Sequence, residues 1–304
     1  MFSETLYDLA KQDQRIHIVV ADISPAGSMA RFREEFPERF INVGTAEQAM
    51  IGICAGLALK GMRPFAYTIA TFSLYRPFEM VRDDLGYQNL PVTVVGIGGG
   101  VIYSTLGGTH YAQEDIAVAG AIPNMSIIAP CDPQEARDAT RYLALRSGGG
   151  PVYLRFGKAG EPTITGDQCD PFEFGQIRYL RKGNEVAVLS YGVIMATAAE
   201  VADRLTAQGH SVSLIGCHTL KPLDRDGIAD VLRDHREVVV IEEHVPQGGL
   251  APQTKQIAWD IGAKCKLETF TLKDQFVHCY GDHRDILEAH GLSADLILER
   301  LGRE

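Results

Sequence analysis

The sequence has no long hydrophobic run and no excess of positive charge. Its longest nearly apolar segments, 49–59 and 90–102, are interrupted by Gly, Pro or Thr, whereas a membrane-spanning helix needs about 20 apolar residues. Lys and Arg total 29 against 39 Asp and Glu, a formal net charge of -10, and an acidic surface repels phosphate backbones. We therefore expect no membrane span and no nucleic-acid partner.

Cysteine pairs and signal-peptide features are also missing. The six cysteines are scattered along the chain without a C-x-x-C pair, which argues against a disulfide framework and against a zinc site. The N-terminal segment, MFSETLYDLAKQDQR, is charged and amphipathic and lacks the apolar core of a signal peptide. We expect reduced thiols and a cytoplasmic protein.

The common cofactor and catalytic fingerprints are absent as well. The sequence contains no G-x-G-x-x-G that leads from a strand into a helix and no P-loop. It contains no G-x-S-x-G elbow and no H-E-x-x-H motif. The nine histidines show no metal-ligand spacing. The sequence therefore offers no metal site of its own.

The sequence does contain a regular alternation of short apolar runs and longer helical segments. Its 304 residues suggest two domains at about 150 residues each. The expected strands are 16–21, 40–43, 63–69, 91–97, 125–129, 151–155, 185–190, 211–216 and 237–242. The expected helices are 46–60, 76–86, 114–121, 132–147, 194–208, 224–235, 249–262 and 284–301. We predict an α/β fold with two open, mostly parallel sheets.

A change of composition separates the two alternating units. Residues 157–175 are rich in Gly, Pro and Asp and show no apolar period, which is typical of a linker. We predict a first domain at 1–160, a linker at 161–180 and a second domain at 181–304.

Several residues that can carry chemistry lie at the ends of expected strands in the first unit. In open α/β sheets, ligands bind outside the carboxyl ends of the strands, so these side chains are expected at one rim. They are Asp22, Glu47, Phe72, Tyr75, His110 and Arg155.

Two long segments of the first unit resemble a known family. The segment at 39–72, RFINVGTAEQAMIGICAGLALKGMRPFAYTIATF, resembles the pyrimidine-binding domain of transketolases, and so does the segment at 89–136, which contains GGTHYAQED and IPN. In the second unit, the segments at 184–201 and 237–249 resemble the C-terminal domain of the same family. The resemblance covers nearly the whole chain, with several motifs in register.

The resemblance implies a thiamine-diphosphate enzyme that lacks one of its parts. The family holds the diphosphate through Mg²⁺ with a GDG motif and a downstream Asn, whereas this chain has only GDQ at 166–168 and GDH at 281–283. The chain therefore resembles a separately encoded C-terminal half of transketolase. This implies an N-terminal transketolase subunit as partner, which carries the diphosphate-binding domain and most of the Mg²⁺ site, in an α2β2 heterotetramer.

Glu47 and His110 are the catalytic candidates within this resemblance. Glu47 aligns with the family's glutamate, which controls the protonation of the cofactor's aminopyrimidine through its N1′ atom. The alternative for Glu47 is a helix N-terminal acid that interacts only with the helix dipole. His110 aligns with the histidine of the family's TH loop, which polarises a substrate carbonyl or hydroxyl, and its alternative is a structural loop histidine.

Four residues are candidates for cofactor binding. Phe72 and Tyr75 align with aromatic residues that stack on the pyrimidine ring, and their alternative is plain core packing. Asp22 and Ile23 match a family segment near the thiazolium ring. For Asp22 the alternative is an N-cap or interface residue.

Three further positions concern the substrate. Arg155 aligns with an arginine that binds the substrate phosphate, with a surface or interface ion pair as the alternative. Transketolases commonly carry a sugar-binding Asp where this chain has Leu106, and a phosphate-contacting His where it has Gly98. Because Leu cannot accept a hydrogen bond from a hydroxyl, we expect a specialised acceptor that is smaller, less hydroxylated or unphosphorylated.

The favoured function is transfer of a two-carbon ketol unit from a ketose or hydroxypyruvate-like donor to an aldehyde acceptor. One alternative is a 2-oxoacid donor, as in 1-deoxyxylulose-5-phosphate synthase or the beta subunit of 2-oxoacid dehydrogenases. Another is a non-catalytic scaffold subunit. The second unit shows no catalytic constellation, and its strand-end residues His218, Glu242, Glu243 and His244 are interpreted as surface or dimer-interface residues.

Overall fold

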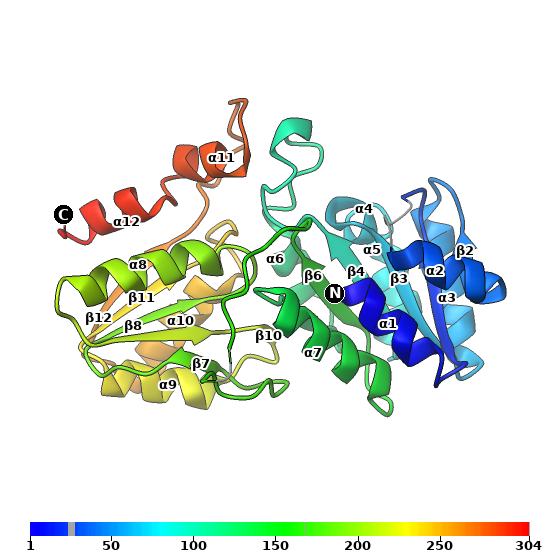
Figure 1. Cartoon of the computed structure of the whole chain (residues 1–304), viewed down its shortest axis with the longest axis horizontal. Helices are drawn as coiled ribbons and strands as arrows, with labels where there is room; N and C mark the ends of the chain where they lie inside the picture. The colour runs from blue at the N-terminus through cyan, green and yellow to red at the C-terminus, as the bar shows by residue number, and fades with distance from the viewer. Residues whose placement is uncertain (24–27, 167, 304) are drawn as a thin grey trace.

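The computed structural model describes residues 1–23, 28–166 and 168–303. Its strands form two open sheets side by side (Figure 1), one of seven strands in the order β10-β5-β6-β4-β3-β1-β2 and one of five in the order β12-β11-β8-β9-β7. Neighbouring strands are parallel except for β10 with β5 and β7 with β9. The predicted class, two open and mostly parallel α/β sheets, is confirmed.

The first sheet is formed almost entirely by the N-terminal half of the chain. Its strands are β1 (Ile16–Val20), β2 (Phe40–Asn42), β3 (Arg63–Ile69), β4 (Thr93–Ile97), β5 (Ser126–Ile128), β6 (Val152–Phe156) and β10 (Thr219–Lys221). Its helices are α1 (Phe2–Ala10), α2 (Ser28–Glu35), α3 (Glu47–Leu59), α4 (Ala70–Leu74), α5 (Phe78–Met80), α6 (Asp115–Gly120) and α7 (Pro133–Leu145). All five residues of β4 are buried, because helices cover both faces of a parallel sheet.

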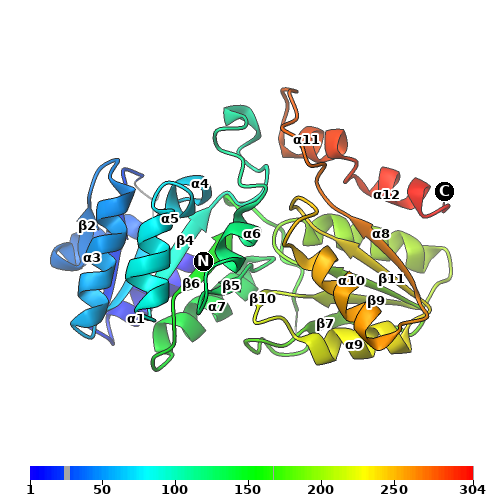
Figure 2. The ribbon, with the colours of Figure 1, turned by 180° about the vertical axis from the view of Figure 1, so that it is seen from behind.

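The second sheet belongs to the C-terminal half. Its strands are β7 (Arg178–Arg181), β8 (Val186–Ser190), β9 (Val212–Gly216), β11 (Glu237–Ile241) and β12 (Lys266–Phe270). Its helices are α8 (Met195–Ala207), α9 (Arg225–Asp234), α10 (Leu250–Ile261), α11 (His283–His290) and α12 (Ala294–Arg300). Figure 2 shows α9 and α10 on the face of this sheet opposite α8.

The sequence patterns located most elements but misplaced several. The single helix predicted at 284–301 is two helices, because α11 ends at Gly291 and Ser293 caps the start of α12. The helix predicted at 76–86 is a short α5 that continues as a π-helix at Val81–Tyr87. The patterns gave no indication of α1, α2, α4, β7, β10 or β12. Among the described helices, none is long and apolar enough to cross a membrane.

The two halves are joined by a shared strand. β10 lies in the C-terminal half of the sequence, yet it pairs antiparallel with β5 at the edge of the first sheet. Lys221, at the end of β10, donates hydrogen bonds to the carbonyl oxygens of Gly120 (2.8 Å) and Ile122 (2.7 Å). This pairing fixes the C-terminal half beside the loops that follow the strands of the first sheet.

Candidate functional site

Most of the sequence-predicted site residues lie where strands of the first sheet end. β1, β2, β3 and β4 are neighbours or near neighbours in one parallel arrangement, so their carboxyl ends meet at one edge. Asp22 follows β1, Glu47 begins α3 after β2, and Phe72 lies in α4 directly after β3. The loop that carries Leu106 and His110 follows β4.

Glu47 is a buried carboxylate that forms an ion pair with Arg76. Its side chain is 4% exposed, and Arg76 Nη1 contacts both carboxylate oxygens at 3.1 and 3.0 Å. Glu47 is also the first residue of α3, where the helix dipole favours negative charge. Arg76 is 48% exposed, so it can turn into solvent when another hydrogen-bond partner binds Glu47.

An aromatic group lies next to this ion pair. The Arg76 guanidinium lies 4.9 Å from the centroid of the Phe72 ring. The Phe72 and His110 rings meet edge to face with 5.3 Å between their centroids. Tyr103 contacts the same histidine, with 6.2 Å between centroids. The contacts therefore run from Glu47 through Arg76 and Phe72 to His110.

The loop after β4 explains one departure from the family pattern. Gly98 has a φ of 78°, and a Cβ atom there would lie 2.1 Å from Cε2 of Tyr103. The Tyr103 ring therefore fills the space that a side chain at position 98 would need. Leu106, in a 3-10 turn of the same loop, is 51% exposed.

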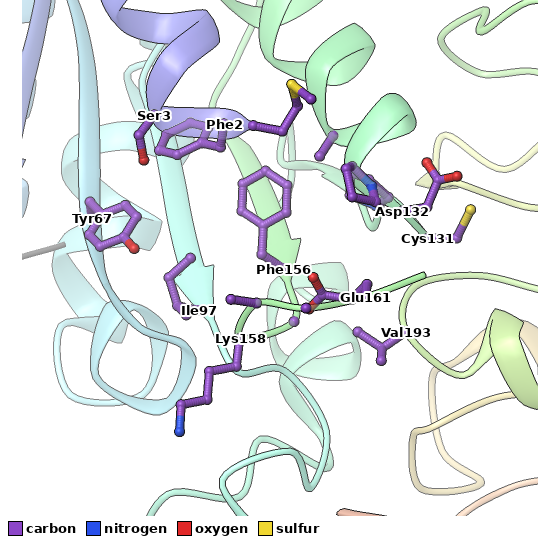
Figure 3. Close-up of a pocket in the computed structure, with 17 residues that line it drawn as sticks. Phe2, Ser3, Tyr67, Ile97, Cys131, Asp132, Phe156, Lys158, Glu161 and Val193 are labelled. Carbon is purple, nitrogen blue, oxygen red and sulfur yellow. The ribbon is translucent and has the colours of Figure 1, made fainter. Parts of the chain in front are cut away.

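A cavity opens beside this loop, between α1 and the ends of β3, β4 and β6. It has a volume of about 350 Å³ and an aromatic wall formed by Phe2, Tyr67 and Phe156. Figure 3 shows Lys158 at its rim, extending away from the Phe2 ring. The Lys158 ammonium lies 5.5 Å from the centroid of the Tyr103 ring. Lys158 was missed at the sequence level, although it is a cation just past the end of β6.

Arg155 does not point toward the cavity or toward Glu47 and Phe72; its side chain is buried against Asp115. It is 4% exposed and forms an ion pair with Asp115 through Nε, at 2.8 Å. Its Nη2 donates to the carbonyl oxygen of Glu243, at 3.0 Å. Burial by itself would lower the pKa of Arg155, but Asp115 and other neighbouring acidic groups raise it above its usual value. The geometry favours the interface ion pair that the sequence left open, rather than a phosphate ligand.

Tyr75 lies in different surroundings from Phe72. Its ring packs against the core of the protein, and its buried hydroxyl has no hydrogen-bond partner among the described residues. Burial, followed by the nearby Asp115 and Glu114, raises its pKa well above the usual value. These surroundings favour core packing over stacking on a ligand.

Asp22 and Ile23 mark the end of β1. Asp22 is exposed and has a φ of 62°, and its backbone N–H donates to Oδ1 of Asn42 at 3.3 Å. Ile23 packs against the core on the α1 side of the sheet. The residues that follow, 24–27, lie outside the described part of the chain.

The side chains present fit one part of the cofactor that the resemblance implies. An aminopyrimidine needs a buried carboxylate for its ring nitrogen and an aromatic face for its ring, and Glu47 and Phe72 supply both. In the part of the chain that the structure describes, no three His, Cys, Asp or Glu side chains gather to hold a metal ion. The GDQ at 166–168 includes a residue outside that part.

Two family models match this chain. Residues 1–160 match the transketolase pyrimidine-binding domain, and residues 175–297 match the transketolase C-terminal domain. One of the subunits of apulose-4-phosphate transketolase from Actinobacillus succinogenes is 32% identical over 92% of this chain and 89% of its own length. A 1-deoxy-D-xylulose-5-phosphate synthase of Bacillus cereus is 32% identical over 98% of this chain, which spans 47% of that enzyme.

Solved structures show the same arrangement. A split-gene transketolase, described as an inactive beta4 tetramer, has a TM-score of 0.85 and 30% identity, covering 99% of this chain and 95% of that one. Transketolase from Campylobacter jejuni has a TM-score of 0.76 and 19% identity, covering 98% of this chain and 45% of that one. The second match concerns the fold alone.

Proposed function

Since this chain belongs to the transketolase family and is similar to one of the separately encoded subunits of split members, we propose that it is the beta subunit of a split, thiamine-diphosphate-dependent transketolase. The reaction is transfer of a two-carbon ketol unit from a ketose or hydroxypyruvate-like donor to an aldehyde acceptor. The observation that carries this proposal is the joint placement of Glu47, Phe72 and His110 along one edge of the first sheet.

Glu47 has the proton-controlling role. When bound, thiamine diphosphate supplies the carbon nucleophile of the reaction. The Glu47 carboxyl group, when protonated, would donate a hydrogen bond to the ring nitrogen and share its proton with that atom, while the exposed Arg76 moves into solvent. Phe72 provides the face on which the pyrimidine stacks. General acid–base catalysis of this kind contributes about 10²–10⁴-fold to a rate.

His110 and Lys158 handle the substrate. His110 lies against Phe72 and exchanges a proton with the substrate's oxygen atom. Lys158 is exposed, close to Tyr103 and at the rim of the cavity, where its ammonium can bind an anionic end of the substrate. Lys158 therefore takes the role that the resemblance gave to Arg155.

A partner subunit supplies what this chain lacks. Because the described residues hold no metal-binding cluster, we assign the diphosphate and Mg²⁺ to an N-terminal transketolase subunit, in an α2β2 heterotetramer. The similar split-gene transketolase is described as inactive as a beta4 tetramer. We expect this chain alone to be inactive in the same way.

A 2-oxoacid donor is the second candidate. It is supported by the similarity to 1-deoxy-D-xylulose-5-phosphate synthase over nearly the whole chain. The two candidates differ in the donor that they require. Hydroxypyruvate or a ketose supports ketol transfer, whereas pyruvate supports the synthase-like reaction.

The first experiment identifies the partner. The tagged chain is purified from its native host, and the co-purifying proteins are identified by mass spectrometry. A stoichiometric subunit with GDG and a downstream Asn supports the proposal. The complex is then assayed with thiamine diphosphate, Mg²⁺ and each donor, apulose 4-phosphate included. Recovery of this chain alone, without cofactor-dependent activity, would replace the proposal with a scaffold role.

A further inference from the structure

The loop that carries His110 is closed at its base by a backbone pairing of Gly100 with Ala112, which we call the neck of the loop. Gly100 and Ala112 form a pair of backbone hydrogen bonds, at 3.0 and 2.8 Å, across the base of the loop. The residues between them form the loop, which includes Tyr103, Leu106 and His110. The position of His110 therefore depends on what fixes this neck.

The neck is fixed by a carboxylate from the C-terminal half. Glu243, just after β11, is 1% exposed, and its Oε1 accepts the backbone N–H of Val101 at 2.7 Å. The same oxygen accepts a hydrogen bond from Nε2 of His283, at the start of α11, at 2.9 Å. A Cβ atom on Gly100 would lie 2.3 Å from this oxygen, so the approach is possible only with glycine there.

Further contacts connect the loop with the same region. Val101 and Tyr111 are buried within the hydrophobic core of the second sheet. A Cβ atom on Gly108 would lie 3.3 Å from the Phe276 ring, so the segment before α11 runs along the loop. Figures 1 and 2 both show this segment beside the loop after β4. The loop belongs in sequence to the first half, and it packs against both halves: His110 contacts Phe72 of the first, and Val101 and Tyr111 pack in the core of the second.

We propose that Glu243, held by His283, is a positioning residue that fixes the loop carrying His110 for the transfer reaction. The C-terminal half thus takes part in shaping the substrate site. The catalytic part of this inference rests on the proposed function. The structural part, that Glu243 holds the loop, does not depend on it.

The charges around the pair favour its ionised form. Burial alone would raise the pKa of Glu243, but the charge and hydrogen bond of His283, together with Arg155, lower it. Burial would lower the pKa of His283, but Glu243 and Asp282 raise it above 6.5. Burial and then Lys273 lower the pKa of His290 to about 4, against a smaller opposing effect of Glu243, so His290 stays neutral near pH 7.

The sign of the pH dependence follows from these shifts. Since the pKa of Glu243 is lowered from 4.5 and that of His283 is raised from 6.5 in the folded protein, the stabilisation by the pair is fully present between pH 4.5 and pH 6.5. It is lost as the pH rises through the raised value. Protection of the loop amides, corrected for intrinsic exchange, is therefore expected to fall over that range in the wild type. It should not depend on pH in this way in His283→Gln.

Hydrogen exchange tests whether Glu243 holds the loop through the backbone N–H of Val101, a contact that we call the tether. We compare the wild type with Glu243→Gln, which keeps the shape but removes the charge, and with Glu243→Ala, which removes the acceptor. Exchange of amides 101–112 is expected to rise about tenfold in Glu243→Ala and less in Glu243→Gln, as for loss of a hydrogen bond to a charged group. Lys221→Met is the matched control, because it removes another contact between the halves away from this loop.

Two results would overturn the inference. One is unchanged exchange of 101–112 in both Glu243 variants. The other is an equal rise across the whole C-terminal half, which would indicate general destabilisation. In the reconstituted complex, Glu243→Gln should lower kcat/KM about tenfold, as for a displaced catalytic group, while Lys221→Met does not. If the wild-type complex turns over no donor, the proposed function fails, and hydrogen exchange still decides the tether.

Discussion

The buried carboxylate Glu47 differs from the buried carboxylates Glu242 and Asp115 in the kind of partner that it has. At the edge of the first sheet, the ion-pair partner of Glu47 among the described residues is Arg76, which is half exposed. Within the C-terminal half, Glu242 is fully buried and accepts hydrogen bonds from Tyr191 and from two backbone N–H groups at the start of α10. Asp115 is likewise satisfied, by Tyr153 and Arg155.

The difference lies in the partners rather than in the degree of burial. A carboxylate whose partners are buried and fixed cannot exchange them for a ligand without leaving a donor unsatisfied. A carboxylate whose partner can move into solvent is available for chemistry. We therefore assign Glu47 to the reaction, and Glu242 and Asp115 to the stability of the half in which each lies. The following changes test that division.

Glu47→Ala is expected to give the largest effect. Loss of its proton-holding oxygen should lower kcat of the reconstituted complex by about 10²–10⁴-fold. Because Arg76 is exposed enough to be solvated, assembly with the partner should remain intact, as measured by native mass spectrometry. Glu47→Gln, which keeps the volume, serves as the control for packing and should be similarly inactive. Retained turnover in either variant would remove the catalytic role.

Arg155→Leu should act on stability. It leaves Asp115 buried without its ion-pair partner, which costs about 3–5 kcal/mol for a buried pair. Chemical denaturation measures the change in the free energy of unfolding. Arg233→Leu removes an arginine from an exposed ion pair with Asp230 and should leave that free energy unchanged. If Arg155→Leu kept full stability and weakened only substrate binding, the phosphate role would be restored.

Lys158→Met should act on substrate binding alone. Its ammonium is exposed, so the free energy of unfolding should not change. KM for an anionic substrate should rise about tenfold, as for loss of a charge-assisted contact. A neutral acceptor such as glycolaldehyde provides the comparison, and its KM should stay the same. Equal effects on both acceptors would argue against anion binding at Lys158.

Leu106→Asp should have the smallest effect, and it is a gain. The exposed position can accommodate a carboxylate, which can accept a hydrogen bond from a sugar hydroxyl. One such bond corresponds to about a 5- to 10-fold improvement in kcat/KM for ordinary aldose phosphates. Leu106→Asn is the uncharged control and should give a smaller gain. An unchanged or lower kcat/KM would show that Leu106 does not set acceptor choice.

Much of the fold was predictable from local patterns. Buried β-branched runs identified the strands of the parallel sheets, and the helix expected at 132–147 is α7, which Asp132 caps. The elements that escaped prediction are short or amphipathic. β10 has three residues and is a strand only because β5 lies beside it, which no local pattern encodes.

For the candidate site too, local sequence patterns predicted some features, and the tertiary structure decided the others. The sequence alone placed Glu47 at a helix start and His110 in a loop after a buried strand, because hydrophobic periodicity fixes where strands and helices end. Only the tertiary structure decided which cation lies at the rim of the cavity. Arg155 and Lys158 are three residues apart, yet one is buried against Asp115 and the other is exposed over Tyr103. Burial and partners arise from contacts between distant segments, and for that reason the structure, not the sequence, connects Glu243 with the loop of His110.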